Sequence, residues 1–298
     1  MTDPATLDRI RDLPCFSGLI EIAPLSGGLS NENWLVTDAA GRHVVRLGRD
    51  FPFHHVDRAR EVMTARAAHA AGFGPRVEYS EPGIMVSAFL DARTFDAADV
   101  RANAGRIGRL LRDFHLTMPH HVAGAGFMFW VFHVIRDYAR TLRSGGSRMA
   151  DRLPAWIELS GRLEAEQCPL PIVFGHNDLL PANFLDDGDR LWLIDFEYAG
   201  FSTAMFDIAG AASNAEMGPD EAAILIETAL GSAPDPAITR AFHAMQCASL
   251  LRETLWSLVS ELHLDAPGVD YRAYTAENLA RLDTALEHYH STYGKTSP

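Results

Sequence analysis

The segment from residue 174 to residue 195 constrains the fold of this chain more than any other. It reads FGHNDLLPANFL, continues through a stretch of hairpin length, and ends in LWLID. The apolar sequences PIVF before it and RLWLI within it are short runs of the kind that form buried strands. We therefore expect a loop and a short hairpin that bring Asp178, Asn183 and Asp195 together in one cleft.

The order and spacing of these polar residues indicate phosphoryl transfer. Asp178 and Asn183 stand at the two ends of the kinase catalytic-loop pattern H-R-D-x-x-x-x-N, with His176 in place and Asn177 where arginine would stand. A hydroxyl that attacks a γ-phosphate needs a carboxylate to orient it and to accept its proton, and Asp178 fits this catalytic role. We expect His176 to hold the loop through hydrogen bonds rather than to exchange protons with substrate.

The second aspartate points to a metal ion. Asp195 ends an apolar run in the sequence DFE, where the kinase architecture has the metal-binding aspartate of DFG. Mg²⁺ arrives with the phosphates of ATP and takes oxygen ligands while keeping some of its waters. Asp195 and Asn183 supply one carboxylate and one amide oxygen, so we predict them as the Mg²⁺ ligands.

A wider resemblance covers most of the chain. It rests on SGGLSNENWLV (26–36), HVVRLG (43–48), VFGHNDLLPANFL (173–185), LIDFEYAG (193–200) and FDIAG (206–210). These segments resemble the choline/ethanolamine kinase family within the aminoglycoside-phosphotransferase-like kinases of the protein-kinase-like superfamily. The resemblance implies an α+β, protein-kinase-like fold with two lobes. The smaller lobe, 1–88, would bind the nucleotide, and the larger, mostly helical lobe, 89–298, would carry catalysis and acceptor binding.

Sequence periodicity predicts the same division. Short β-branched or alternating runs separated by turn residues predict a small antiparallel sheet, and a run of helix formers that ends at Gly72 predicts one main helix beside it. The expected strands are 20–25, 33–37, 43–47, 76–80 and 84–87, and the expected helix is 56–71. Beyond residue 100 apolar residues recur at helical spacing. The helices expected there are 130–142, 152–166, 220–230, 236–264 and 271–289, besides a buried stripe over 107–114.

The nucleotide site is predicted from the smaller lobe. The only lysine of the chain is Lys295, so the phosphate-binding cation of a kinase strand must be another residue. Arg46 is the available cation, its fork can bind two phosphate oxygens, and Glu61 is the best candidate to pair with it. The other predicted nucleotide contacts are the backbone of a Gly-rich turn over the phosphates and the connection between the lobes: Gly27, Gly28, Leu29, Ser30, Ser87 and Phe89.

The acceptor site is predicted from two segments, DFEY and a late helix. The candidates are Glu197, Tyr198, Arg252, Glu253 and Trp256. In the family that the chain resembles, a late helix presents paired tryptophans to a quaternary ammonium, and Glu253 takes the place of the first. A carboxylate also suits a primary ammonium, whereas Arg252 could bind a substrate carboxylate or phosphate. The alternative is that Arg252 and Glu253 form a structural ion pair, and that choice stays open at this point.

Composition excludes several classes of protein. The formal net charge of −13 argues against nucleic acid or an anionic membrane as the main partner, and no apolar run reaches the length that a bilayer requires. We expect a cytoplasmic enzyme without membrane insertion, and a homodimer stays open. The pairs His54–His55 and His120–His121 lack companion carboxylates at zinc-site spacing, so surface or capping roles are expected for them.

These observations predict an ATP- and Mg²⁺-dependent kinase of a small amino alcohol, most simply choline or ethanolamine. One alternative is a kinase of another amine-bearing alcohol on the same scaffold, of the thiamine or aminoglycoside type. A more distant alternative is a nucleotide-binding module without catalysis, against which the intact Asp178, Asn183 and Asp195 argue.

Overall fold

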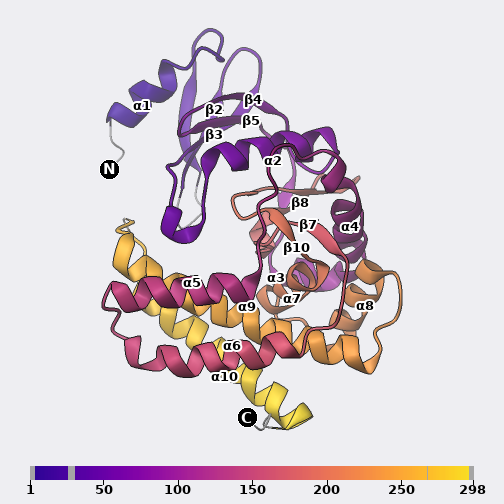
Figure 1. Ribbon diagram of the computed structural model, residues 1–298. Coiled ribbons are helices and arrows are strands. Elements are labelled where there is room, and N and C mark those ends of the chain that lie inside the picture. Colours follow the sequence, from indigo (N-terminus) through magenta and orange to yellow (C-terminus); the bar gives the residue numbers. More distant parts are fainter. Residues whose placement is uncertain (1–3, 26–30, 267, 295–298) are drawn as a thin grey trace.

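A computed structural model of the chain describes residues 4–25, 31–266 and 268–294. It consists of two lobes, with a small sheet and its helices at the top of Figure 1 and a bundle of helices below. The α+β, two-lobed, protein-kinase-like fold predicted from the sequence is confirmed. The Gly-rich turn Gly27–Ser30, predicted to close over the phosphates, lies outside the described residues.

Five antiparallel strands form the sheet of the smaller lobe, in the order β1-β2-β3-β5-β4. The strands are β1 (Glu21–Leu25), β2 (Glu32–Thr37), β3 (Arg42–Leu47), β4 (Val77–Glu81) and β5 (Ile84–Ala88). Side chains alternate between the two faces, and Val36, Val45 and Val86 are fully buried on one of them. Helix α1 (Pro4–Arg11), which the sequence pattern did not predict, covers this face with the buried Ile10.

The main helix of the smaller lobe, α2 (Arg58–Ala70), lies between the sheet and the larger lobe (Figure 1). Its start is fixed by Asp57, whose carboxylate accepts a hydrogen bond from the backbone N–H of Arg60. The chain turns away just after it at Gly72, in the left-handed conformation that glycine adopts easily. Helix α2 thereby presents the residues of its first turn to the cleft.

Hydrophobic packing divides the molecule unequally. The inner sheet residues form a small cluster of their own with α1. The loop before α2 and the buried face of α2 instead belong to the large core of the helical lobe, through Phe51, Val56 and Ala68. The upper sheet is therefore the part of the smaller lobe that has an independent core.

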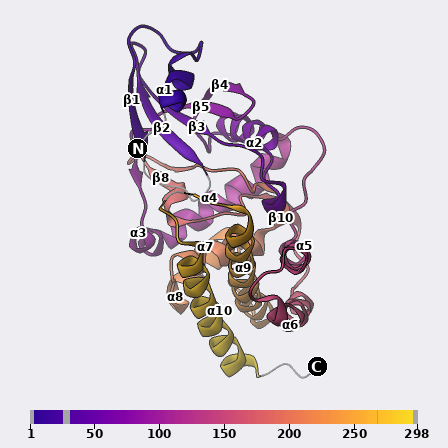
Figure 2. The ribbon, with the colours of Figure 1, turned by 90° about the vertical axis from the view of Figure 1, so that its left-hand side faces the viewer.

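Helix α9 is the centre of the larger lobe, and it contacts α5, α6, α7 and α10. In Figure 2 it runs beside α10. The helices of this lobe are α3 (Ala97–Ala102), α4 (Ala104–Thr117), α5 (Val131–Ser144), α6 (Leu153–Ala165), α7 (Ala204–Asn214), α8 (Pro219–Leu230), α9 (Pro236–His263) and α10 (Tyr271–Tyr293). None of the helices in the described ranges is both long and apolar enough to cross a bilayer.

Short strands carry the predicted catalytic segment. The hairpin expected after Asn183 is β8–β9, which β6 extends to three strands, and β7 pairs with β10 in an antiparallel ribbon. Their bounds are β6 (Arg93–Thr94), β7 (Ile172–Gly175), β8 (Phe184–Asp186), β9 (Leu191–Leu193) and β10 (Gly200–Thr203). Four single turns of 3-10 helix are also described: η1 (Pro52–His54), η2 (Met118–His120), η3 (Ala150–Arg152) and η4 (Pro181–Asn183).

Helices α7 and α10 of the larger lobe depart from the sequence prediction, as does the short α3, which was not predicted. Helix α7 was not predicted, because its residues AMFDIAGAASN are small or apolar on nearly every side and show no amphipathic period. Its first nine residues are all buried. Helix α10 continues to Tyr293, beyond the end predicted at residue 289. Neither α7 nor α10 carries a residue that was predicted to bind the nucleotide.

Candidate active site

The catalytic loop follows β7 and is held from below by Asp207 of α7. The Asp207 carboxylate accepts hydrogen bonds from the backbone N–H groups of His176 (2.8 Å) and Asn177 (2.7 Å), and from the His115 side chain (2.8 Å). Burial opposes ionisation of Asp207, but the bond from His115 lowers its pKa overall. A Cβ atom at Gly175 would lie 2.8 Å from Asn177 Oδ1 and 3.1 Å from Asp207 Oδ2, so this close approach requires glycine.

Two buried side chains of the loop are fully engaged with backbone. His176 Nε2 lies 2.9 Å from the carbonyl oxygen of Ile194, and burial lowers the pKa of His176, so its neutral ring donates to that carbonyl. Asn177 has a φ of +64°, which asparagine tolerates, and its Nδ2 donates to the carbonyl oxygens of Gly175, Tyr198 and Gly200. His176 therefore ties the catalytic loop to the chain just before Asp195.

The Asp178 side chain lies in the wall of a narrow cavity between the catalytic loop, α7 and α9. It shares this wall with Asn214, Arg252 and Glu253, and the cavity encloses about 20 Å³. The protein atoms crowded around the Asp178 carboxyl raise its pKa well above its ordinary value, and Arg252 opposes this rise. The raised pKa makes the ionised Asp178 carboxylate a stronger base towards a substrate hydroxyl.

Asn183 joins the two aspartates. Its Nδ2 donates to the carbonyl oxygen of Asp178 at 2.8 Å, and its own carbonyl oxygen accepts from the backbone N–H of Ile194 at 3.1 Å. Asp195 follows directly, with a φ of +68° that turns it out of the strand direction. Since the nitrogen end of the Asn183 amide is used on Asp178, its oxygen is the end left for a cation.

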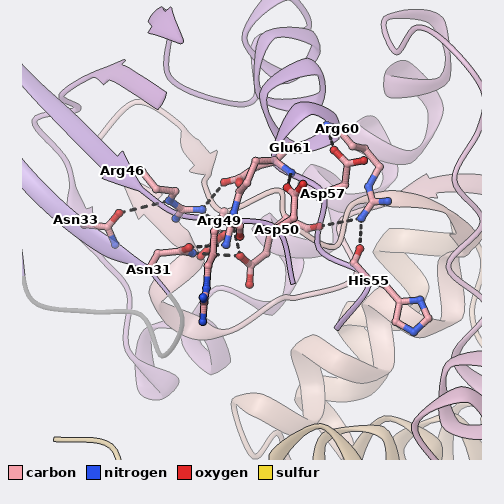
Figure 3. Close-up of polar contacts among 12 residues, drawn as sticks. Asn31, Asn33, Arg46, Arg49, Asp50, His55, Asp57, Arg60 and Glu61 are labelled. Carbon is pink, nitrogen blue, oxygen red and sulfur yellow. Dashed lines mark hydrogen bonds and ion pairs between the residues drawn. The ribbon is translucent and has the colours of Figure 1, made fainter. Parts of the chain in front are cut away.

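Charged residues of the smaller lobe meet Asp195. Arg46 Nη1 on β3 donates to Asp195 Oδ1 (2.6 Å) and to Glu61 Oε1 on α2 (2.5 Å), the partner that the sequence predicts (Figure 3). Arg46 Nε also lies 3.4 Å from Asn33 Oδ1. Burial opposes ionisation of Asp195, but Arg46 lowers its pKa overall, so the Asp195 carboxylate is charged at neutral pH. Both lobes therefore meet at one ion-pair network.

Arg58 extends this network, which the sequence did not reveal. Its Nη1 donates to Glu61 Oε2 (2.6 Å) and to Glu197 Oε2 (2.9 Å), and its Nη2 donates to Asn31 Oδ1 (2.6 Å). The i, i+3 spacing of Arg58 and Glu61 on α2 was the available signal. Glu197, placed with the acceptor residues from the sequence, lies here instead. It does not line the cavity beside Asp178.

A second cavity, of about 320 Å³, lies between the sheet and the β8–β9 hairpin. Of the six described residues that were predicted for nucleotide and metal, five line this cavity: Arg46, Ser87, Phe89, Asn183 and Asp195. The backbone N–H of Phe89 donates to the carbonyl oxygen of Arg42, so it is already used in the edge of the sheet. An adenine edge would have to meet other backbone groups of this connection.

The predicted acceptor residues separate into two layers. Arg252 and Glu253 line the cavity beside Asp178, and they also form an ion pair of 2.8 Å. Their role towards an acceptor stays a prediction. Tyr198 and Trp256 lie behind them, buried and joined by a hydrogen bond from Trp256 Nε1 to the Tyr198 hydroxyl (2.8 Å). The aromatic side chains therefore support this cavity without lining it.

The expectation of a surface or capping role for His54 is wrong. His54 is 1% exposed, its ring stacks on Trp256 with centroids 4.8 Å apart, and its Nε2 lies 2.9 Å from Ser260 Oγ. Its neighbour His55 lies 3.0 Å from Asp137 of α5. The loop before α2 therefore reaches into the helical lobe, a long-range contact that local sequence does not encode.

Metal-binding groups are sparse in the part of the chain that the structure describes. No set of three or more His, Cys, Asp and Glu side chains is placed there to hold an ion. Asp195 is the one carboxylate among the residues that line this second cavity, and Asn183 adds an amide oxygen beside it. Such a set suits Mg²⁺, which binds proteins through one or two carboxylates and takes its other ligands from water and phosphate.

The fold and this cleft have a kinase-like architecture. Residues 21–242 match the model of the phosphotransferase enzyme family, and the chain belongs to that family. A solved choline/ethanolamine kinase family protein from Mesorhizobium loti superposes with a TM-score of 0.77 and 26% identity, over 95% of this chain and 94% of that one.

Curated relatives carry different acceptor names. A probable ethanolamine kinase of Arabidopsis thaliana is 29% identical over 214 residues, which cover 64% of this chain and 55% of that protein. A homoserine kinase of Methylobacillus flagellatus is 25% identical over 205 residues, 64% of this chain and 62% of that protein. The matches thus span little more than half the length of these relatives.

Proposed function

We propose that this chain is an ATP- and Mg²⁺-dependent kinase that phosphorylates the hydroxyl of an amine-bearing alcohol, with choline or ethanolamine as the leading acceptor class. The observation that carries the proposal is the link that Asn183 makes between the two aspartates. Its side-chain amide holds the carbonyl of Asp178, and its backbone carbonyl holds Ile194, next to Asp195. Asp178, on the acceptor side of the cleft, and Asp195, on the nucleotide side, are thus fixed relative to each other.

Asp178 is the catalytic base of the proposed reaction. It orients the acceptor hydroxyl, whose oxygen forms a bond to the γ-phosphorus while the bond from that phosphorus to the bridging oxygen of ADP breaks. The hydroxyl proton passes to Asp178. Its raised pKa supports this role, because a more basic carboxylate accepts a proton more readily than a solvated one. His176 positions the loop through the carbonyl of Ile194.

Asp195 and Asn183 are the residues that would hold Mg²⁺, and Arg46 would meet phosphate oxygens beside them. When bound, the metal neutralises negative charge on the phosphates of ATP. Arg46 Nη1 contacts both Glu61 and Asp195, so its guanidinium is already positioned at the donor end of the cleft. A positioned cation reduces the cost of reorganisation during transfer.

The acceptor class rests on the relatives and on Glu253. Proteins named ethanolamine kinase, choline kinase and homoserine kinase are among the similar sequences, and these names share an acceptor that carries both a hydroxyl and an amine. Glu253 lies in the cavity wall with Asp178 and can accept from an ammonium N–H. Other amine-bearing alcohols remain the alternative. A cytoplasmic location, which the composition favours, is part of the proposal.

Transfer of labelled phosphate from ATP to a panel of amino alcohols tests this function. Choline, ethanolamine, homoserine and thiamine would be incubated with the protein and Mg²⁺, and the phosphorylated acceptor would be separated from free phosphate. We expect one acceptor class to be labelled, and labelling to require Mg²⁺. The Asp178→Asn protein, which keeps the shape of the side chain, is the matched control. ATP binding without labelling of any hydroxyl acceptor would contradict the proposal.

A further inference from the structure

Arg252 is a buried cation in the wall of the cavity beside Asp178. It lies on α9 and is 3% exposed, and its guanidinium carbon is 4.6 Å from the centre of the Tyr198 ring. Arginine does not lose its proton in proteins, so this charge stays in place when the side chain is buried. A buried charge is costly unless it is paired and hydrogen-bonded.

The pairing of Arg252 is incomplete. Its Nη1 donates to Glu253 Oε2 at 2.8 Å, whereas Nε and Nη2 have no hydrogen-bond partner among the described residues. A guanidinium with one engaged nitrogen keeps a free edge, and two parallel N–H groups on such an edge match a carboxylate. Leaving these donors unpaired is unfavourable, so a ligand anion at this edge would gain more than it would at the surface.

Two of the three carboxylates that line this cavity already have partners within the protein. Glu253 accepts from Arg252 and also from the Tyr274 hydroxyl (2.8 Å), while Asp207 is engaged with His115 and the loop amides. Arg252 is the one cation among the residues that line this cavity. An acceptor that offers only an ammonium would therefore leave the two unpaired nitrogens of Arg252 without a partner.

We propose that the acceptor carries a carboxylate as well as its hydroxyl and amine, that is, a hydroxylated amino acid, and that the free edge of Arg252 receives this carboxylate. The inference rests on the proposed kinase function. Within the amine-bearing alcohols it places hydroxylated amino acids ahead of choline and ethanolamine, which carry no carboxylate. The hydroxyl faces Asp178, and the ammonium faces Glu253, on the opposite side of the ion pair. Arg252 thus selects the acceptor and takes no part in the transfer of phosphate.

The size of the cavity requires a local rearrangement. About 20 Å³ holds little more than one water molecule, so an acceptor of any class enters only when side chains around it move. Arg252 has a long side chain with several rotatable bonds, and its contact with Glu253 is its single hydrogen bond among the described residues. Its guanidinium can turn towards an incoming carboxylate while that bond is kept.

Matched acceptors test this inference. L-Serine is ethanolamine with an added carboxylate, and L-homoserine is 3-aminopropan-1-ol with an added carboxylate, so each pair isolates one group. We expect the carboxylate-bearing member of at least one pair to have a kcat/KM about tenfold higher or more, the scale of a charge-assisted hydrogen bond. Phosphorylated acceptor, not ADP release alone, is the quantity to measure.

Replacement of Arg252 separates selection from catalysis. Arg252→Gln should raise KM for the carboxylate-bearing acceptor of a pair. The kcat/KM of that acceptor, divided by the kcat/KM of its partner without the carboxylate, should then fall to about one. The matched control is Arg148→Gln, which removes an arginine paired with Glu261 at the surface and should leave the ratio unchanged. If the Arg252 variant fails to fold, the ratio in the unmodified protein decides by itself.

Three outcomes would overturn the inference. Preference of the unmodified protein for ethanolamine and 3-aminopropan-1-ol would show that no carboxylate is selected, and the kinase function would stand. An equal loss of kcat with all acceptors in Arg252→Gln would place Arg252 on the transferred phosphoryl group. Failure to phosphorylate any acceptor would remove the proposed function, and the inference with it.

Discussion

The donor and acceptor sides of the cleft differ in how their charges are satisfied. On the donor side Arg46, Glu61, Arg58 and Asp195 are joined by hydrogen bonds of 2.5–2.6 Å. On the acceptor side Arg252 has one such bond and two free nitrogens. The donor is one nucleotide, so its site can be fully organised in advance. On the acceptor side the Arg252 guanidinium is left only partly paired, and the carboxylate of the proposed acceptor can complete its pairing.

The largest expected effect concerns Asp178, which stands between the two sides. Asp178→Asn should lower kcat by about 10²-fold or more, because the amide cannot accept the hydroxyl proton. ATP affinity should change little, since Asp178 does not line the nucleotide cavity. Turnover with the preferred acceptor and ATP binding by calorimetry would be measured together. Near-normal turnover would remove Asp178 from the role of base.

The next prediction concerns the proposed Mg²⁺ ligands on the donor side. Asp195→Ala should abolish most of the gain in ATP affinity that Mg²⁺ provides, because it removes the one charged ligand proposed. Asn183→Ala should reduce that gain less. Calorimetric titration of ATP with and without Mg²⁺ measures both. An equal Mg²⁺ effect in Asp195→Ala and in the unmodified protein is incompatible with the assignment.

A third prediction tests the organisation of the donor side. Glu61→Gln leaves Arg46 and Arg58 without a shared carboxylate, so KM for ATP should rise by about tenfold, the cost of one charge-assisted hydrogen bond. The matched control is Glu166→Gln, which affects a pair with Arg240 remote from the cleft. If both variants keep the normal KM, the network is not needed to hold Arg46.

A fourth prediction sharpens the acceptor side. Glu253→Gln should raise KM several-fold for an acceptor with N–H donors and less for choline, which has none. The KM for ATP should stay the same, because Glu253 lies outside the nucleotide cavity. Steady-state kinetics with ethanolamine and choline provides the comparison. An equal rise for both acceptors would place the ammonium away from Glu253.

The smallest predicted effect concerns the contact between the lobes. Burial holds the pKa of His54 well below its ordinary value of 6.5, with smaller contributions from Arg252 and His263. The folded protein then binds fewer protons than the unfolded chain, so stability present above about pH 6.5 falls as the pH drops below it. Between pH 7.5 and 5.5 this costs about 1 kcal/mol in free energy of unfolding.

Urea unfolding at the two pH values measures this contribution. His54→Gln removes the titrating ring, so its loss of stability on acidification should be smaller than that of the unmodified protein by about 1 kcal/mol. His120→Gln, at an exposed position, is the control and should behave as the unmodified protein does. If all three lose the same stability, His54 does not titrate as the buried neutral group inferred here.

The sequence predicted the parts whose partners are fixed by a motif. The strands and helices, the pairing of Arg46 with Glu61 and the convergence of Asn183 with Asp195 follow from short patterns of spacing and polarity. Helix α7 escaped because small apolar residues surround its axis and leave no period to detect. Motif spacing therefore predicted contacts that depend on short segments of sequence.

Long-range partners could not be predicted in the same way. Arg58 binds Glu197, which is 139 residues further along the chain, and His54 bonds Ser260 across a gap of 206. Nothing local distinguishes His54 from a surface histidine, because its burial depends on Trp256 of another lobe. Glu197, predicted as an acceptor residue, is a further case: its sequence neighbour Tyr198 packs behind the acceptor cavity, whereas its own side chain bonds Arg58.

Arginine at position 46 also decides how this cleft can be probed chemically. Reagents that label kinases by acylation act on the amine of a strand lysine, whereas a guanidinium remains protonated and is a poor nucleophile. The only lysine of this chain is Lys295, far from β3 in sequence. We expect acylating ATP analogues to leave the nucleotide cavity unmodified, and arginine-selective dicarbonyl reagents to be the suitable class of covalent probe.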